Sequence, residues 1–178
     1  MLDEKAAKRA EALKNAADEA SRKVEEDARL KREANTNPFH NQVHCARNIY
    51  RAAWMGERDR VVSLLAEGAQ VNAVYKEGYT ALMGAAGSGS DAIVEFLLDH
   101  GARINHQDNN GDTALIFAVI WGRESTVLLL IERGSDIDIK PRNNMTALLW
   151  ARKLNKPAVE RILSDAIKVT RCIHSFVH

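Results

Sequence analysis

The chain has 178 residues, of which 46% are apolar and 28% are charged, and its formal net charge is +1. This is the composition of a soluble globular domain, and the near-zero charge gives no field that would attract nucleic acid or anionic lipid. Apolar runs of about 18 residues, an apolar signal core and a cysteine framework are absent from the sequence, so we expect no membrane partner, no secretion, and a reducing cytoplasmic compartment.

Residues 1–37 are predicted to form one long, charged, alanine-rich helix. The first 35 residues contain no glycine, proline or aromatic residue, and their nine basic and nine acidic residues cancel. Acidic and basic residues alternate at four-residue spacing, as in Glu4 and Lys8, which favours a helix. The narrow alanine stripe suits either a solvated helix or a seam for self-association through residues 1–35. Such tidy charge pairing is also typical of an engineered helix fused to a natural domain.

Residues 38–168 contain several residue classes that recur every 33 positions. Each recurring threonine is followed by Ala-Leu and precedes an apolar stretch, where its hydroxyl can cap the backbone N–H groups of a helix. Each recurring glycine follows an apolar stretch and can end a helix in the left-handed conformation. The period therefore predicts a series of two-helix units. The recurring residues are Thr80, Thr113 and Thr146, then Gly68, Gly101 and Gly134, then Asn72, Asn105 and Asp138.

This pattern resembles the ankyrin repeat. The resemblance implies an all-α solenoid of helix-turn-helix units joined by β-hairpin loops, following the long N-terminal helix. The first unit matches only in its later half, and Asn155 replaces a glycine in the last, as expected of terminal units. The proline that usually follows each threonine is alanine in all three units. The implied units are 41–74, 75–107, 108–140 and 141–168, and residues 169–178 are expected to form a C-terminal tail that is apolar enough to cap the last unit.

Catalytic and metal-binding chemistry is not predicted. The chain lacks a nucleophile elbow, a zinc-protease His pair and a phosphate loop. Two His/Cys clusters exist, but neither reaches four ligands and they lie at opposite ends of the predicted stack. We therefore expect no enzyme activity, no cofactor and no metal. The clusters are His40, His44 and Cys45, and Cys172, His174 and His178.

The resemblance places a binding face on the hairpin tips and the exposed side of each first helix. Trp54 and Trp121 are large and apolar where the family usually presents solvated residues, and Gly87 between them predicts a trough for a partner's helix or apolar side chain. The alternative is that the N-terminal helix or the tail covers both tryptophans. The predicted partner-binding residues are Trp54, Met55, Lys76, Glu77, Tyr79, Ser88, Asn109, Asn110, Asp112, Ile120, Trp121, Arg142, Met145 and Leu154.

The leading hypothesis is thus a non-catalytic protein–protein interaction module that holds a partner segment on its concave face. The alternative hypothesis is an oligomeric or engineered scaffold in which the N-terminal helix drives self-association or fusion. Ankyrin loops also resemble hydroxylase substrates, which would make Asn72 or Asn105 a target of modification.

Overall fold

The computed structural model describes the backbone of residues 38–175 and the side chains of residues 44–170. The predicted helix over residues 1–37, with its self-association seam, lies outside these residues. The chain divides into two compact units, Met1–Asn41 and Gln42–His178, and the description below concerns the second.

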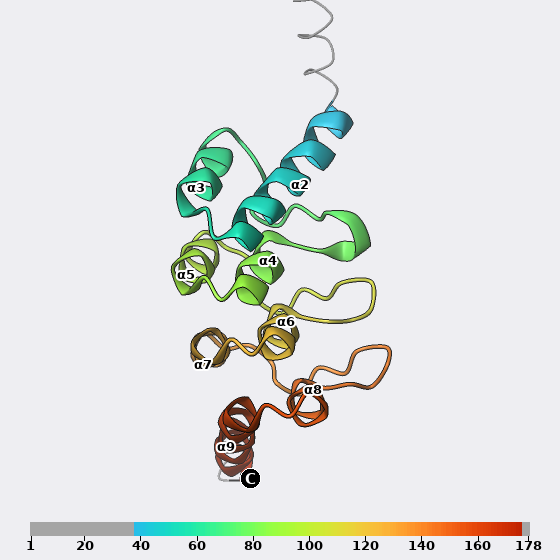
Figure 1. The fold of residues 1–178 in the computed structure, drawn as a ribbon, viewed down its shortest axis with the longest axis vertical. Coiled ribbons are helices and arrows are strands. Elements are labelled where there is room, and N and C mark those ends of the chain that lie inside the picture. The colour runs from blue at the N-terminus through green and yellow to red at the C-terminus, as the bar shows by residue number, and fades with distance from the viewer. Residues whose placement is uncertain (1–37, 176–178) are drawn as a thin grey trace, which may run out of the picture. The chain divides into compact units, whose positions relative to one another are not determined.

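Helices in the described part of the second unit form two parallel rows (Figure 1). In the inner row α4, α6 and α8 pack in sequence, and in the outer row α3, α5, α7 and α9 do the same. The inner helices α4, α6 and α8 each pack on the outer helix that follows them. No strand occurs in residues 38–175, and the hairpin loops contain one bridge, between Tyr75 and Tyr79. The predicted all-α solenoid is confirmed. The inner helices are α2 (Pro38–Met55), α4 (Ala81–Ser88), α6 (Ala114–Trp121) and α8 (Ala147–Lys153); the outer helices are α3 (Arg58–Ala66), α5 (Asp91–Asp99), α7 (Glu124–Glu132) and α9 (Pro157–Ser175).

The helices begin and end at the residues that the 33-residue period indicated. The side-chain oxygen of Thr80 accepts a hydrogen bond from the N–H of Met83 at 3.4 Å, and Thr113 and Thr146 cap α6 and α8 in the same way. The outer helices end near glycines with positive φ, such as Gly68. Asn155, which stands at the glycine position of the last unit, also takes a positive φ of 51°. Local backbone requirements therefore account for the recurring residues.

The core lies between the two rows and is continuous through the second compact unit. Alanine follows each capping threonine and is almost completely buried, which allows close approach of neighbouring inner helices. Larger aliphatic residues, such as Leu97 and Leu130 of the outer row, fill the space behind them with no exposed surface. Each unit therefore buries its apolar faces against its neighbours, as a repeat solenoid must.

Three of the inner helices, α2, α4 and α6, end at a glycine on which a side chain of the following unit lies. A Cβ added to Gly89 would approach the Arg123 side chain to 2.7 Å, and the Arg123 Nε donates a hydrogen bond to the Gly87 carbonyl at 3.1 Å. These contacts join consecutive units at their corners. The equivalent pairs are Gly56 with Ser90, Gly89 with Arg123, and Gly122 with Lys156.

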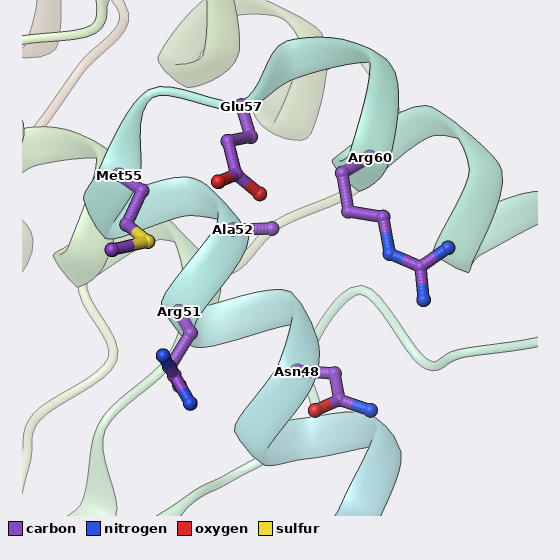
Figure 2. Close-up of a pocket in the computed structure, with 6 residues that line it drawn as sticks. All are labelled: Asn48, Arg51, Ala52, Met55, Glu57 and Arg60. Atoms are coloured by element: carbon purple, nitrogen blue, oxygen red, sulfur yellow. The ribbon is translucent and has the colours of Figure 1, made fainter.

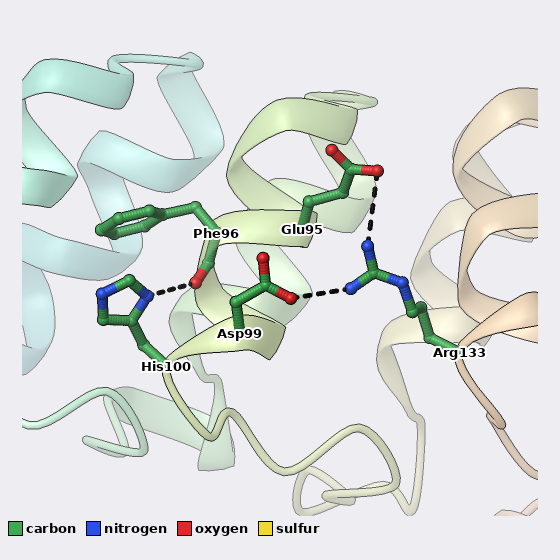
Figure 3. A network of polar contacts seen from close by, with 5 residues as sticks. All are labelled: Glu95, Phe96, Asp99, His100 and Arg133. Atoms are coloured by element: carbon green, nitrogen blue, oxygen red, sulfur yellow. Dashed lines mark hydrogen bonds and ion pairs between the residues drawn. The ribbon is translucent and has the colours of Figure 1, made fainter.

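The outer helices are linked by exposed polar contacts (Figure 3). Arg133, which follows α7, pairs with Asp99 at 3.0 Å and with Glu95 at 3.5 Å, both in α5. On the other side of α5, the rings of His100 and Phe96 are in contact, with 4.1 Å between their centroids. Exposed ion pairs of this kind contribute about 0–1 kcal/mol each to the free energy of unfolding. They are therefore a minor part of the stability of the stack.

The region expected to form a C-terminal tail, residues 169–178, is helical as far as Ser175. Helix α9 runs from Pro157 to Ser175 without a break at residue 169. Val169 was expected to help cap the last unit, but it is 60% exposed. Helix α9 continues because residues 158–175 contain no glycine or proline that would end it. None of the helices in the described part is long and apolar enough to cross a membrane.

Candidate functional site

Six aromatic residues from three successive units lie together along the inner row; we call them the aromatic cluster. Tyr50 stacks on Tyr79 at 5.6 Å between ring centroids, and Tyr79 meets Phe117 edge to face at 5.6 Å. Trp54 meets Trp121 edge to face at 5.3 Å. The cluster therefore runs from α2 through the first hairpin to α6. Its members are Tyr50, Trp54, Tyr75, Tyr79, Phe117 and Trp121.

The cluster can form because α4, which lies between α2 and α6, has two glycines where it faces these rings. A Cβ on Gly84 would lie 2.9 Å from the Tyr50 carbonyl oxygen. A Cβ on Gly87 would lie 2.6 Å from Trp54 Cζ3 and 3.3 Å from Trp121 Cδ1. The missing side chains thus leave room for residues of the first and third units to meet.

The predicted trough between the two tryptophans is therefore wrong. Gly87 is buried, and Trp54 and Trp121 pack against each other over it. Two large apolar side chains close over a gap of this size because each then buries more apolar surface. Trp54 is half-buried as a result, whereas Trp121 keeps 49% of its surface exposed. The face carries an aromatic ridge in place of a trough.

The hairpin tips carry the predicted polar residues, with one exception. Lys76, Glu77, Asn109 and Arg142 are exposed, as is Asn110. Neighbouring tips are joined: the Asn109 N–H donates to the Glu77 carbonyl at 2.8 Å, and the Arg142 N–H donates to the Asn110 carbonyl at 2.9 Å. The tips of three successive units therefore form one continuous edge.

Asp112 is the exception, because it was expected on the exposed tip and is only 9% exposed. The Asp108 carboxylate accepts hydrogen bonds from the N–H groups of Asn110 and Asp112, both at 2.8 Å. The Asp108 N–H also donates to the Asp112 carbonyl at 2.9 Å. This turn pulls Asp112 inward. Oδ1 of Asp112 is buried without a hydrogen-bond partner, and burial together with the nearby Asp108 raises the pKa of Asp112.

Tyr79 lies between the aromatic cluster and these acidic residues. Burial raises the pKa of its hydroxyl, and the charges of Asp108, Glu77 and Asp112 raise it further. Three carboxylates therefore act on the Tyr79 hydroxyl, while its ring contacts Tyr50 and Phe117.

The remaining predicted residues have different surroundings. Ser88 is part of the packing, because its hydroxyl donates to the Ala53 and Ala85 carbonyls at 3.2 and 2.9 Å. Ile120 and Met145 are partly buried, and Leu154 is 38% exposed.

Three members of the aromatic cluster were missed: Tyr50, Tyr75 and Phe117. A signal for two of them exists, because Tyr50 precedes Trp54 by four residues and Phe117 precedes Trp121 by four. Residues at this spacing share one face of a helix.

Met55 belongs to a separate feature, a pocket of about 220 Å³ where α2 meets α3 (Figure 2). Asn48 and Arg60 line this pocket, whereas the residues 33 positions later, Ala81 and Ile93, are buried between units. Polar residues thus stand where an internal unit would be apolar, which is typical of the end of a repeat stack. The lining residues are Asn48, Arg51, Ala52, Met55, Glu57 and Arg60.

Comparison with known proteins identifies the repeats. The family model for ankyrin repeats matches residues 49–141 in three copies, which is more than half of the chain. A search of curated proteins found no match. Ankyrin repeats are generally protein–protein interaction modules and are typically non-catalytic. The matched residues run from the last part of α2 to the end of the α7 unit, and the chain belongs to the ankyrin-repeat family.

Proposed function

We propose that this protein is a non-catalytic module that holds a segment of a partner protein on the face formed by the inner helices and the hairpin tips. The observation that carries the proposal is the aromatic ridge, on which Trp121 is 49% exposed at the end of α6. Tryptophan is among the residues most enriched at binding hot spots, because it buries a large area with little loss of side-chain freedom.

The surroundings of Trp121 support this assignment. Its indole is held in place by the edge-to-face contact with Trp54, so little ordering is needed when a partner binds. The continuous edge of hairpin tips offers backbone and polar side-chain groups next to the apolar ridge. An apolar centre beside a polar rim is the usual composition of a protein–protein interface.

The test begins with a random peptide display library selected on the full chain, followed by titration of the recovered peptides as synthetic compounds. Trp121→Ala should weaken binding at least about tenfold, the size of a hot-spot loss, while the protein stays folded. Leu128→Ala is the matched control, because Leu128 is 45% exposed but lies on α7 of the outer row. It should bind like the unsubstituted chain.

Equal binding by the two variants would contradict the proposal, because the ridge would then contribute nothing. So would unfolding of Trp121→Ala, because Trp121 would then be a core residue. Circular dichroism melts of both variants distinguish this outcome from a loss of binding.

A further inference from the structure

We propose that the partner segment carries an aspartate or glutamate beside the apolar residue that packs on Trp121, and that Lys153 and Lys156 bind its carboxylate. This inference rests on the proposed function, and it adds the chemistry of the partner. We call the place the lysine subsite; it consists of Trp121, Lys153, Leu154 and Lys156.

The first step is the charge of the fourth unit. Residues 141–168 contain six basic and two acidic residues, whereas residues 75–140 contain five basic and ten acidic residues. Both acidic residues of the fourth unit pair with basic residues of the same unit, at 2.8 and 3.0 Å. The ion pairs in the described part of the chain involve neither Lys153 nor Lys156. These two lysines therefore carry positive charge that no carboxylate of the described residues pairs with.

The second step places Lys156 next to Trp121. A Cβ added to Gly122, the residue that follows Trp121, would lie 2.5 Å from the Lys156 Nζ. The ammonium group therefore rests on the end of α6. Lys156 is partly buried in this position, so its side chain is already ordered before a partner binds.

This contact does not require a cation. A positive charge at the end of a helix interacts favourably with the helix dipole, which is a structural reason for a lysine there. At the end of α2, however, the equivalent residue on Gly56 is the neutral Ser90. Packing over the glycine therefore does not explain why the fourth unit has a lysine at this position.

The third step continues the ridge into the fourth unit. Leu154 stands 33 positions after Trp121 and is 38% exposed. Lys153 is exposed, and its Nζ lies over the Trp150 ring at 5.0 Å from the centroid. This cation–π contact orients the side chain. Two exposed apolar residues and two oriented ammonium groups thus occupy neighbouring positions of the third and fourth units.

The fourth step selects a single carboxylate over a polyanion. Nucleic acids and anionic membranes present many negative charges, and they would be repelled by the acidic excess of residues 75–140. An acidic residue in a peptide segment places one charge at the lysines and leaves the acidic units uncovered. An apolar contact beside the ion pair also excludes water, which strengthens the attraction between the charges.

The experiment uses the peptides that the full chain selects from a random display library. Peptides whose binding requires Trp121 should carry an aspartate or glutamate at one fixed distance from an apolar residue. The best of them is synthesised with the acidic residue and with the corresponding amide. Each version is titrated against the unsubstituted chain and two double variants, Lys153→Gln/Lys156→Gln and the control Arg161→Gln/Lys168→Gln. The control removes two exposed charges of the same unit from the outer helix α9.

The change from acid to amide should weaken binding about tenfold or more to the unsubstituted chain and to the control. On Lys153→Gln/Lys156→Gln the same change should cost less than about threefold, because the charges that the carboxylate meets are gone. Lys153→Gln alone alters only an exposed side chain and should give an intermediate loss, which keeps the test valid if the double variant unfolds. Equal losses on all the proteins would overturn the inference.

The outcomes also separate this inference from the proposed function. Trp121-dependent peptides that contain no acidic residue, or that carry a basic one, would overturn the lysine subsite and leave the binding face intact. Failure to recover any Trp121-dependent peptide would contradict the proposed function and the subsite together.

Other occupants of the lysine subsite give different results. Tighter binding to single-stranded RNA or to phosphatidylserine vesicles than to the peptides, lost in Lys153→Gln/Lys156→Gln, would assign the lysines to a polyanion and overturn the inference. Dimers in light scattering that disappear in the same variant would assign them to a second copy of the chain, with the same consequence.

Discussion

The indole of Trp54 meets that of Trp121 edge to face, with 5.3 Å between ring centroids and 81° between ring planes. One residue belongs to the inner helix of the first unit and the other to that of the third. The contact therefore spans the whole second unit, whose helix α4 carries Gly87 beneath both rings. In a solenoid, where units usually contact only their neighbours, this is a next-nearest interaction.

This contact predicts coupling between the two tryptophans. Trp54→Ala and Trp121→Ala should each lower the free energy of unfolding, and the double variant should lose less than the sum of the two. The expected coupling is about 0.5–1.5 kcal/mol, the usual size for an aromatic pair. Urea unfolding at equilibrium measures it; additive losses within about 0.3 kcal/mol would show that the rings do not interact.

Gly87→Ala should destabilise the protein although alanine favours helices. The new Cβ would lie 2.6 Å from Trp54 Cζ3, and overpacking of this kind typically costs about 1–3 kcal/mol. The gain in helix propensity, about 1 kcal/mol, offsets only part of that. Trp54→Ala provides the control: in that background Gly87→Ala should be neutral or stabilising. The same loss in both backgrounds would rule out the clash as the cause.

Glu77→Asn should stabilise the first hairpin, which the bridge between Tyr75 and Tyr79 closes. Glu77 has a φ of 60°, whereas the other two non-glycine residues with positive φ in the described part are already asparagines, Asn144 and Asn155. The left-handed conformation costs about 1–2 kcal/mol for an ordinary residue, and asparagine tolerates it better, so we expect a gain of about 0.5–1 kcal/mol. Glu77→Gln removes the charge without relieving the backbone, so its melting temperature should not rise. An equal rise in both variants would point to charge instead.

Asp112→Asn should stabilise the protein at neutral pH, by an amount of the order of 1 kcal/mol. Burial, and next the charge of Asp108, raise the pKa of Asp112 above that of the unfolded chain. The folded state therefore holds the proton more tightly, and the unsubstituted protein loses stability as the pH rises through the raised pKa. The advantage of the variant should be largest at neutral pH and should shrink as the pH falls below that pKa.

Urea unfolding of Asp112→Asn and the unsubstituted chain at several pH values measures this dependence. Asp138→Asn serves as the exposed control and should show no such change with pH. A constant difference between Asp112→Asn and the unsubstituted chain at all pH values would contradict the ionisation argument.

The repeats could be predicted from the sequence because local backbone requirements determine them. A threonine that caps α4 and a glycine that ends α3 each satisfy a need within a few residues of their own position. Such needs recur with the period of the chain, so Thr80, Thr113 and Thr146 identify their helices without knowledge of the packing.

The binding face could be predicted only in part, because its details depend on contacts between units. Trp121 was identified as a large residue in an unusual position, but the closure of Trp54 over Gly87 depends on a side chain that is missing from another helix. Asp112 is buried by the Asp108 turn, and that hairpin is tied at Asn109 to the preceding one. The helix over residues 1–37 lies outside the described part of the chain and stays a prediction.

The two glycines of α4 also mean that no later unit of this protein can take the place of the second unit. The positions equivalent to Gly84 in the third and fourth units hold Phe117 and Trp150. Either ring would collide with the backbone of Tyr50, since even a Cβ would come within 2.9 Å of its carbonyl oxygen. Ankyrin arrays can evolve by duplicating or exchanging units, but a recombinant of this protein that replaces its second unit with a copy of a later one would not close. The second unit packs against its neighbours only because it has glycine at these two positions, so it cannot be exchanged for a later unit.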